Sequence, residues 1–231
     1  MADRSPFLIA LTGGSGSGKS TIAEALLDTL GRHRTVLIGE DAYYRPMSDY
    51  GPTDTDAQRL SIIERINYDS PAAKEAERLK TDLETLKSGR GVEAPIYDYA
   101  RHDRSERTRA IAPAQVILLE GIHALSMPEI EPLIDLSVYV DTPDDLRLAR
   151  RLRRDVVERG RNVEDVLSQY LSTVRASHYR YTFPAKFEAD LVIADEGLPA
   201  YGHVRPTQPA IQRMLAPVLE RLVSEGVLAQ I

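Results

Sequence analysis

The segment at residues 13–20 constrains the fold of this chain more than any other part of its sequence. It reads Gly-Gly-Ser-Gly-Ser-Gly-Lys-Ser, which fits the phosphate-binding loop pattern of glycine, four residues, glycine, lysine and serine. The apolar run at residues 7–11 precedes it and predicts a buried strand. A helical apolar face follows it. The loop is therefore expected to join a strand to a helix, which is the context that this motif requires.

Further apolar runs predict the other strands of the same sheet, at residues 35–38, 115–119, 136–140 and 191–194. Helical patterns lie between them, at about residues 19–30, 59–66, 70–88, 143–159 and 163–179. This alternation predicts an α/β fold of the P-loop NTPase type, with a mostly parallel sheet and helices on both faces. Ligands of such sheets bind beyond the carboxyl ends of the strands.

Three stretches interrupt the alternation. Residues 41–56 are polar and rich in Tyr, Asp and Pro, which predicts a long loop. Ser70 and Pro71 suit the N-cap and first position of a helix, so a helix is expected to begin there. Residues 92–99 and 108–111 predict a small β-hairpin around a basic, polar loop.

Composition excludes several classes of protein. The chain has 231 residues, no Cys and a formal net charge of -6. Disulfides, thiolate catalysis and Cys-ligated zinc are therefore excluded, and an acidic total argues against general nucleic-acid binding. No apolar run approaches the roughly 20 residues that span a bilayer, and no signal peptide is recognisable. We expect a cytoplasmic protein that binds neither membrane nor nucleic acid.

The glycine-rich segment predicts binding of ATP through its phosphates. Its backbone N–H groups and the helix N-terminus point at phosphate oxygens, and Lys19 reaches the β- and γ-phosphates. Ser20 can ligate Mg²⁺, together with Glu120 at the end of a predicted strand. Segments typical of guanine recognition and of transporter ATPases are missing from the sequence, which favours a kinase. The expected phosphate-binding residues of the loop are Gly13, Gly14, Ser15, Gly16, Ser17, Gly18, Lys19, Ser20 and Thr21.

Two further features suggest the transfer chemistry. Asp41 follows the second predicted strand and projects over the same sheet edge, where a carboxylate can take the proton of an acceptor hydroxyl; alternatively it caps a turn. Seven of the fifteen residues at 147–161 are Arg. Such a helix can close over the phosphates, although a solvated basic helix is the commoner meaning of a charge run.

Several ordered segments resemble the uridine kinase family, within the group that contains phosphoribulokinase. The resemblance covers residues 6–194, and its segments are residues 41–45, 67–71, 95–104, 119–122, 140–161, 168–175 and 189–193. It implies transfer of the ATP γ-phosphate, with Mg²⁺, to the 5′-hydroxyl of uridine or cytidine. The family often forms tetramers, so a homo-oligomer, tetramer or dimer, is expected.

The resemblance also implies roles for individual residues. Asp41 would be the general base. Asp69 and Arg147 would hold the ribose hydroxyls. The nucleoside pocket would be shaped by Tyr44, Tyr97 and Tyr99, with His102 at the base. Lid contacts to the phosphates would come from Arg150, Arg151 and Arg154, while Ser20 and Glu120 attend the Mg²⁺. Because Tyr97 and Tyr99 share one face of a strand, one of them can instead belong to the core.

Three positions depart from the family pattern around the acceptor. Ser70 stands where His is usual, Asp165 where Gln is common, and His123 follows Glu120-Gly-Ile in the manner of the phosphoribulokinase branch. A related kinase for another small hydroxylated acceptor, such as a sugar phosphate, stays an alternative. A nucleotide-binding regulator without catalysis is a third interpretation.

These features predict one kinase domain at residues 1–196. It would contain an acceptor-binding insert at about 41–112 and an Arg-rich lid at about 143–162. Residues 197–231 would form a Pro- and Gly-containing linker and an amphipathic helix that packs on the domain or on a partner subunit. The expected face of this helix carries Ile211, Leu215, Val218, Leu222 and Val223.

Overall fold

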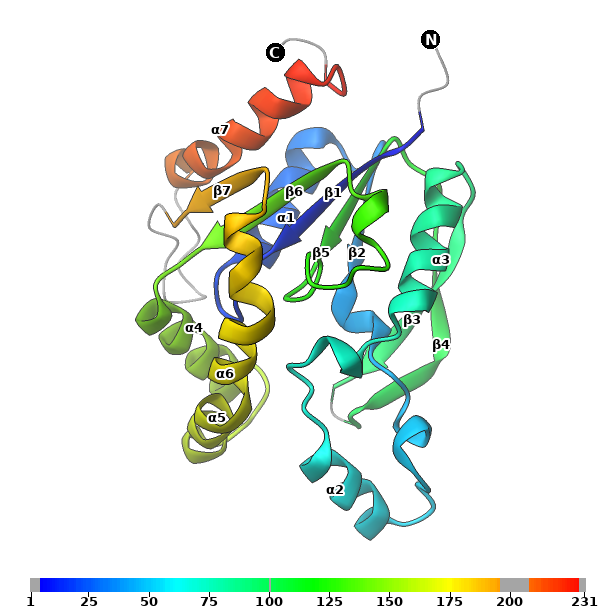
Figure 1. The fold of residues 1–231 in the computed structure, drawn as a ribbon, viewed down its shortest axis with the longest axis vertical. Coiled ribbons are helices and arrows are strands. Elements are labelled where there is room, and N and C mark those ends of the chain that lie inside the picture. Colours follow the sequence, from blue (N-terminus) through cyan, green and yellow to red (C-terminus); the bar gives the residue numbers. More distant parts are fainter. Residues whose placement is uncertain (1–4, 100, 196–207, 229–231) are drawn as a thin grey trace.

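A five-stranded parallel sheet forms the centre of the molecule (Figure 1). A computed structural model describes residues 5–99, 101–195 and 208–228. The strand order is β2–β5–β1–β6–β7. The strands are β1 (Phe7–Thr12), β2 (Thr35–Gly39), β5 (Val116–Glu120), β6 (Leu136–Asp141) and β7 (Leu191–Ala194). All five lie where apolar runs predicted them, and the predicted α/β fold with a parallel sheet is confirmed.

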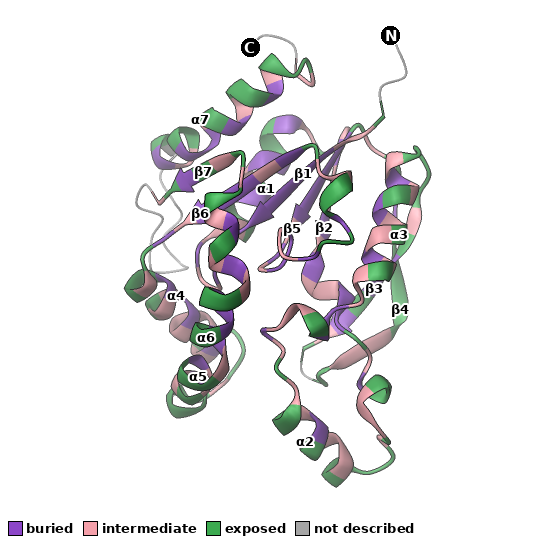
Figure 2. Cartoon of the chain, viewed as in Figure 1, coloured by how far each residue is buried: buried purple, intermediate pink, exposed green. Residues whose placement is uncertain are grey.

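Helices cover both faces of the sheet. Successive side chains of β1 point to opposite faces, so its apolar residues contribute to a core on each side. Ile9 and Leu11 join one hydrophobic core with α1 (Lys19–Leu30) and α7 (Gln208–Ser224). Leu8 and Ala10 join a second core, with α3 (Ala76–Lys87). Figure 2 shows these central strands largely buried beneath the helices. Helices packed on both faces therefore support the edge of the sheet at which the carboxyl ends of the strands lie.

The insert between β2 and β5 differs from its prediction in three places. The predicted loop at residues 41–56 contains two short 3₁₀ turns, Glu40–Tyr43 and Met47–Tyr50, before α2 (Asp56–Arg65). Ser70 does not cap α3; its side chain caps the separate 3₁₀ turn Pro71–Ala73, and α3 begins three residues later. The predicted basic loop is mostly strand, because β4 (Asp103–Ile111) pairs with β3 (Val92–Asp98) over most of its length.

Two helical segments stand beyond the other half of the sheet edge. The arginine-rich α4 (Asp144–Val157) follows β6, with Pro143 at its N-cap. A second segment begins with α5 (Val163–Gln169) and continues through α6 (Arg175–Ser177), with π turns at Tyr170–Val174 and His178–Thr182. Figure 1 shows α4, α5 and α6 below the sheet on one side and α2 on the other. The predicted helices at 143–159 and 163–179 are confirmed, the latter with these π interruptions.

The C-terminal helix α7 packs on the domain itself. Met214, Leu215, Val218 and Leu222 are buried in the core that α1 and β6 also build. Most of the predicted linker lies outside the described residues, and its last two positions belong to α7. Among the described helices, none combines the length and apolar character needed to cross a membrane.

Candidate active site

The glycine-rich loop closes tightly between β1 and α1. Gly16 and Gly18 have positive φ angles of 83° and 89°, which side chains rarely adopt. A Cβ atom on Gly16 would lie 2.3 Å from the backbone oxygen of Arg147. The N–H of Ser17 donates to the carbonyl of Gly14 at 3.0 Å. The loop therefore has the curvature in which backbone N–H groups surround a phosphate.

Lys19, Ser20 and Glu120 meet at the start of α1. The Ser20 hydroxyl donates to Glu120 Oε1 at 3.1 Å, and Lys19 Nζ lies 3.6 Å from the same oxygen. Burial raises the pKa of Glu120, and Lys19 only partly opposes this. A carboxylate whose charge is poorly compensated beside a serine hydroxyl suits a divalent cation.

The oxygen ligands fit a magnesium ion held jointly with a nucleotide. Among the described residues, no group of three or more Asp, Glu or His side chains forms a complete metal site. Mg²⁺ usually binds through one or two protein oxygens, with water and substrate phosphates completing its shell. Ser20 and Glu120 supply two such oxygens next to the phosphate loop.

Asp41 lies on the 3₁₀ turn that follows β2, across the sheet edge from the phosphate loop. Its side chain is 46% exposed, and its Oδ1 accepts a charged hydrogen bond from Lys74 Nζ at 2.7 Å. Burial raises the pKa of Asp41, but Lys74, followed by Lys19 and Arg154, outweighs it and holds that pKa well below its usual value. Asp41 is therefore ionised and close to the groups that would bind phosphate.

Lys74 is a site residue that the sequence did not predict. Its side chain is fully buried and also binds Glu40 Oε1 at 2.8 Å. The other oxygen of Glu40 accepts the backbone N–H of His123 at 2.9 Å. A signal existed: Lys74 is one of only five lysines and follows the family-like segment at residues 67–71 by three positions. Lys74 and Glu40 thus form a buried ion pair directly behind Asp41.

Aromatic rings gather beside Asp41, from the insert and the β3–β4 hairpin. Tyr44 lies 4.8 Å from Tyr97 and 5.7 Å from Tyr68, between ring centroids. Tyr97 contacts Tyr99 at 5.4 Å, and Tyr68 contacts His102 at 5.5 Å. Tyr97 is buried whereas Tyr99 is 47% exposed. Tyr97 therefore packs inside the cluster, and Tyr99 and His102 offer ring surface to a ligand.

His102 closes this aromatic surface at the hairpin turn. It has a positive φ of 50°. Burial lowers its pKa, and Arg161 of the lid lowers it further. A neutral imidazole carries one N–H and one bare nitrogen, so it can both donate and accept a hydrogen bond. His102 is therefore suited to the edge of a polar ring.

Asp69 joins the insert to the second helical segment. Its Oδ2 accepts the hydroxyl of Thr173 at 3.0 Å, and its backbone carbonyl contacts His123 Nε2 at 3.0 Å. Thr173 lies on the π turn after α5. Sequence reasoning gave no role to Thr173 or Tyr68, although both lie in family-like segments, at residues 168–175 and 67–71. Asp69 is fixed from both sides and keeps a carboxylate oxygen for further hydrogen bonds.

The predicted arginines of α4 do not act as one set. Arg147 is buried against the loop: a Cβ on Gly14 would lie 2.3 Å from its Nη1, and the guanidinium also binds Asp144. Arg150 binds Asp195 at 2.6 Å, at the end of β7. Arg147 thus binds Asp144 and packs against the phosphate loop, and Arg150 binds Asp195.

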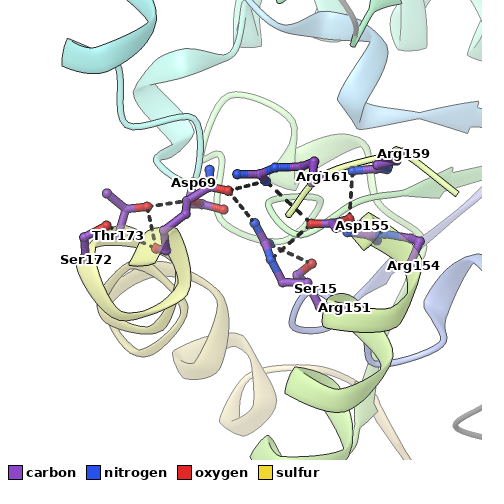
Figure 3. Close-up of polar contacts among 10 residues, drawn as sticks. Ser15, Asp69, Arg151, Arg154, Asp155, Arg159, Arg161, Ser172 and Thr173 are labelled. Atoms are coloured by element: carbon purple, nitrogen blue, oxygen red, sulfur yellow. Dashed lines mark hydrogen bonds and ion pairs between the residues drawn. The ribbon is translucent and has the colours of Figure 1, made fainter. Parts of the chain in front are cut away.

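Arg151 and Arg154 belong to a cluster around the buried carboxylate of Asp155, which is 1% exposed (Figure 3). Four guanidinium groups approach Asp155 within 4 Å, those of Arg151, Arg154, Arg159 and Arg161. Figure 3 shows Arg151 reaching from this cluster to Ser15 of the phosphate loop, which it contacts at 3.0 Å. One carboxylate leaves the cluster with excess positive charge, as an anion-binding lid requires.

Comparisons with known proteins identify the family of this chain. A sequence profile described as "Phosphoribulokinase / Uridine kinase family" matches residues 8–198. The chain belongs to this family. The phosphoribulokinase/uridine kinase family includes a uridine kinase from Ligilactobacillus salivarius, 40% identical over 85% of this chain and 90% of the relative. A uridine kinase from Limosilactobacillus reuteri (strain DSM 20016) is 36% identical over 97% of this chain and 95% of its own.

A solved structure supports the fold assignment for this member of the phosphoribulokinase/uridine kinase family. The phosphoribulokinase from Rhodobacter spheroides superposes with a TM-score of 0.62, covering 98% of this chain and 100% of the other. Identity is only 17%, so this likeness concerns the fold alone.

The three departures from the family pattern have distinct places in the structure. Ser70 accepts the N–H of Ala72 in the turn that leads to Lys74. His123 is buried against Asp69 and Glu40. Asp165 lies exposed in the first turn of α5, where its N–H donates to the Asn162 side chain. Ser70 and His123 therefore lie among the residues that support Asp41 and Asp69, whereas Asp165 does not.

Proposed function

We propose that this chain is an ATP- and Mg²⁺-dependent kinase that phosphorylates the 5′-hydroxyl of uridine or cytidine, giving UMP or CMP. The observation that carries the proposal is the position of ionised Asp41 between the phosphate loop and the aromatic surface. The similarity to proteins named uridine kinase supports the acceptor class.

In this proposal Asp41 accepts the proton of the 5′-hydroxyl while the oxygen attacks the γ-phosphorus, and the bond from that phosphorus to the β,γ-bridging oxygen breaks to release ADP. Lys19 and the loop N–H groups of residues 13–21 hold the phosphates in line with that oxygen. Arg151 and Arg154 offset the charge that spreads over the γ-phosphoryl oxygens. Bound Mg²⁺, attended by Ser20 and Glu120, would neutralise phosphate charge in the same place.

The acceptor would lie between the hairpin and the second helical segment. Asp69 can accept hydrogen bonds from two neighbouring ribose hydroxyls. Tyr99 would border the flat pyrimidine, with Tyr44 and Tyr97 packed behind it to shape the pocket, and His102 would contact the edge of the base. Arg147 and Arg150 would take up their proposed roles at ribose and phosphate beside, or in place of, their contacts with Asp144 and Asp195.

The proposed organisation of the chain follows the same division. Residues 1–196 would form the kinase domain, with the acceptor insert at about 41–112 and the lid at about 143–162. Residues 197–231 would be an appended linker and helix. We also propose that the protein works in the cytoplasm as a homo-oligomer, dimer or tetramer, without nucleic-acid or membrane partners.

An acceptor panel tests the function. ADP release is measured with ATP, Mg²⁺ and each of uridine, cytidine, adenosine, ribulose 5-phosphate and glycerate. We expect turnover with the two pyrimidine nucleosides, and a 5′-monophosphate as product by mass spectrometry. Turnover with ribulose 5-phosphate alone would instead assign a sugar-phosphate acceptor, and ATP binding with no acceptor-dependent turnover would assign a regulator.

A further inference from the structure

A buried lysine stands directly behind the proposed catalytic base. The Lys74 ammonium contacts Glu40 Oε1 at 2.8 Å and Asp41 Oδ1 at 2.7 Å, and it lies 3.2 Å from the centre of the Tyr44 ring. Both Lys74 and Glu40 have side chains with no exposed area. Asp41 is the one member of the trio that reaches solvent.

The backbone delivers Lys74 to this place. Ser70 caps the turn Pro71–Ala73, and the chain after that turn pairs with the segment that carries Asp41. Tyr44 and Lys74 form an antiparallel bridge, flanked by two hydrogen bonds: Arg45 N–H to Ala73 O at 2.9 Å and Glu75 N–H to Tyr43 O at 2.8 Å. The lysine and the base are therefore fixed relative to each other by main-chain contacts.

The charges of Glu40, Asp41 and Lys74 indicate that Lys74 does more than form a structural ion pair with Glu40. A buried ammonium must be matched by a buried carboxylate, and Glu40 already meets that need. Gly121 makes room for Glu40, since a Cβ there would lie 2.1 Å from Glu40 Oε2. Because Glu40 balances Lys74, the trio retains one net negative charge, and this charge belongs to the exposed Asp41. The second contact of Lys74 thus acts on the side chain that would meet the acceptor.

We propose that Lys74 is a positioning residue for phosphoryl transfer, which holds Oδ1 of Asp41 and leaves Oδ2 to receive the proton of the acceptor hydroxyl, with Glu40 as its counter-charge. The inference rests on the proposed function, in which Asp41 is the base. A side chain held at one oxygen loses the rotations that would point the other oxygen away from the substrate. Lys74 also keeps Asp41 in the form that can accept a proton.

Other charged groups act on Asp41 from the neighbouring elements. Lys19 of α1 and Arg154 of α4 lower its pKa in the same direction as Lys74. Glu120 of β5 and Tyr99 beyond β3 face it as well, since Asp41 raises the pKa of each. Glu40 opposes Lys74 from within the trio. Replacing only the Glu40–Lys74 pair changes the two innermost charges and leaves the rest in place.

The test compares Glu40→Gln/Lys74→Met, in which the buried pair is neutral, with Glu40→Gln alone and with the parent. Lys80→Met, a partly exposed lysine on α3, is the control. The readouts are kcat and KM for uridine and ATP, the pH profile of kcat, and ATP affinity by calorimetry. The double variant should lose about tenfold or more in kcat, keep its ATP affinity within about twofold, and show an acid limb displaced towards neutral pH.

Glu40→Gln should behave oppositely, because it leaves the whole charge of Lys74 facing Asp41. The acid limb of its kcat–pH profile should lie at lower pH than that of the parent. Its kcat should fall severalfold because a weaker base accepts the proton. This variant keeps the volume of Glu40, so it serves if the double variant does not fold. A parent-like kcat and pH profile in the folded variants would overturn the inference and leave Lys74 a structural residue.

Failure of the proposed function would look different. A parent chain without turnover on any acceptor of the panel, or an Asp41→Asn variant with normal turnover, would remove Asp41 as the base and this inference with it. Loss of turnover in Asp41→Asn together with normal Lys74 variants would overturn the present inference alone.

Discussion

At the scale of single residues, two carboxylates near Lys19 carry opposite pKa shifts. Burial raises the pKa of both Asp41 and Glu120. At Asp41 the contact with Lys74 reverses the shift, whereas at Glu120 the opposing effect of Lys19 is too small to do so. Asp41 is therefore ionised without a ligand, and Glu120 gains most from a cation. This difference matches the separate roles proposed for them, base and metal ligand.

Asp41→Asn tests the first of these roles. An amide keeps the size of the side chain but cannot take the acceptor proton, so kcat should fall by roughly 10² or more while ATP affinity stays within about twofold. Steady-state kinetics and calorimetry measure the two quantities. Asp54→Asn, at an exposed position of the same insert, is the matched control. Near-normal turnover in Asp41→Asn would remove Asp41 from the chemistry.

His178 predicts a pH dependence of stability. Its ring is buried against Gly14 of the phosphate loop, and burial, with Arg147 adding to it, lowers its pKa to about 4. The unfolded chain therefore binds a proton more readily, so this stability is present above about pH 6.5 and is lost as the pH falls towards 4. The full loss amounts to about 3 kcal/mol.

His178→Gln should remove this dependence. Urea denaturation at several pH values should show the free energies of unfolding of parent and variant converging as the pH falls from 7 to 4. His33→Gln, at an exposed position, is the control. A gap between parent and His178→Gln that is the same at every pH would show that His178 has the same pKa in the folded and the unfolded protein.

At the scale of elements, burial decides what the sequence could predict. The five sheet strands were found because each is a short apolar run, and β1, β5 and β6 are buried on both faces. Residues 103–107, the first part of β4, were mistaken for a loop because none of their side chains is buried and they show no alternation, whereas residues 108–111 were predicted as strand. Ser70 was placed correctly at a cap, but local preference could not distinguish a 3₁₀ turn from the start of α3.

The candidate site divides in the same way. The motif at residues 13–20 and the strand-end acids could be read from sequence, since their spacing defines their place at the sheet edge. The pairing of Lys74 with Asp41 joins segments 33 residues apart, and no local pattern encodes it. The four arginines lie within six residues of Asp155, two of them at helical i,i+4 spacing, so their cluster is local in the sequence but was not predicted. The resemblance gave the residue types of the lid, but not which carboxylates hold Arg147 and Arg150.

Asp155→Asn should loosen the lid. The carboxylate is the shared partner of four guanidinium groups, and its loss leaves the buried Arg151 with Asp69 as its remaining nearby negative charge. Removing one member of a buried ion pair costs about 3 kcal/mol. Urea denaturation should show this loss, and added ATP should recover more stability in the variant than in the parent, because phosphate oxygens replace the carboxylate. Asp145→Asn, on the exposed face of α4, is the control; equal losses in both variants would contradict a hub at Asp155.

At the scale of the whole molecule, the last helix completes a core that the first elements begin. Val218 and Leu222 of α7 share one hydrophobic cluster with Leu26 of α1 and Val138 of β6. The helix that follows the phosphate loop is thus held between the sheet and α7. A segment near the C-terminus therefore supports the orientation of Lys19 and Ser20 at the other end of α1.

Leu222→Ala tests whether α7 unfolds with the domain or separately. Leu222 is fully buried, and deleting such a side chain costs about 3 kcal/mol through lost burial and the remaining cavity. If the core is continuous, the variant should unfold in one transition with the same denaturant dependence as the parent, only at lower urea concentration. Leu60→Ala, at a position that is 59% exposed, should cost less than about 0.5 kcal/mol. A second, earlier transition confined to the C-terminal segment, detected by hydrogen exchange, would instead show that α7 is a separate unit and that the phosphate loop is stable without it.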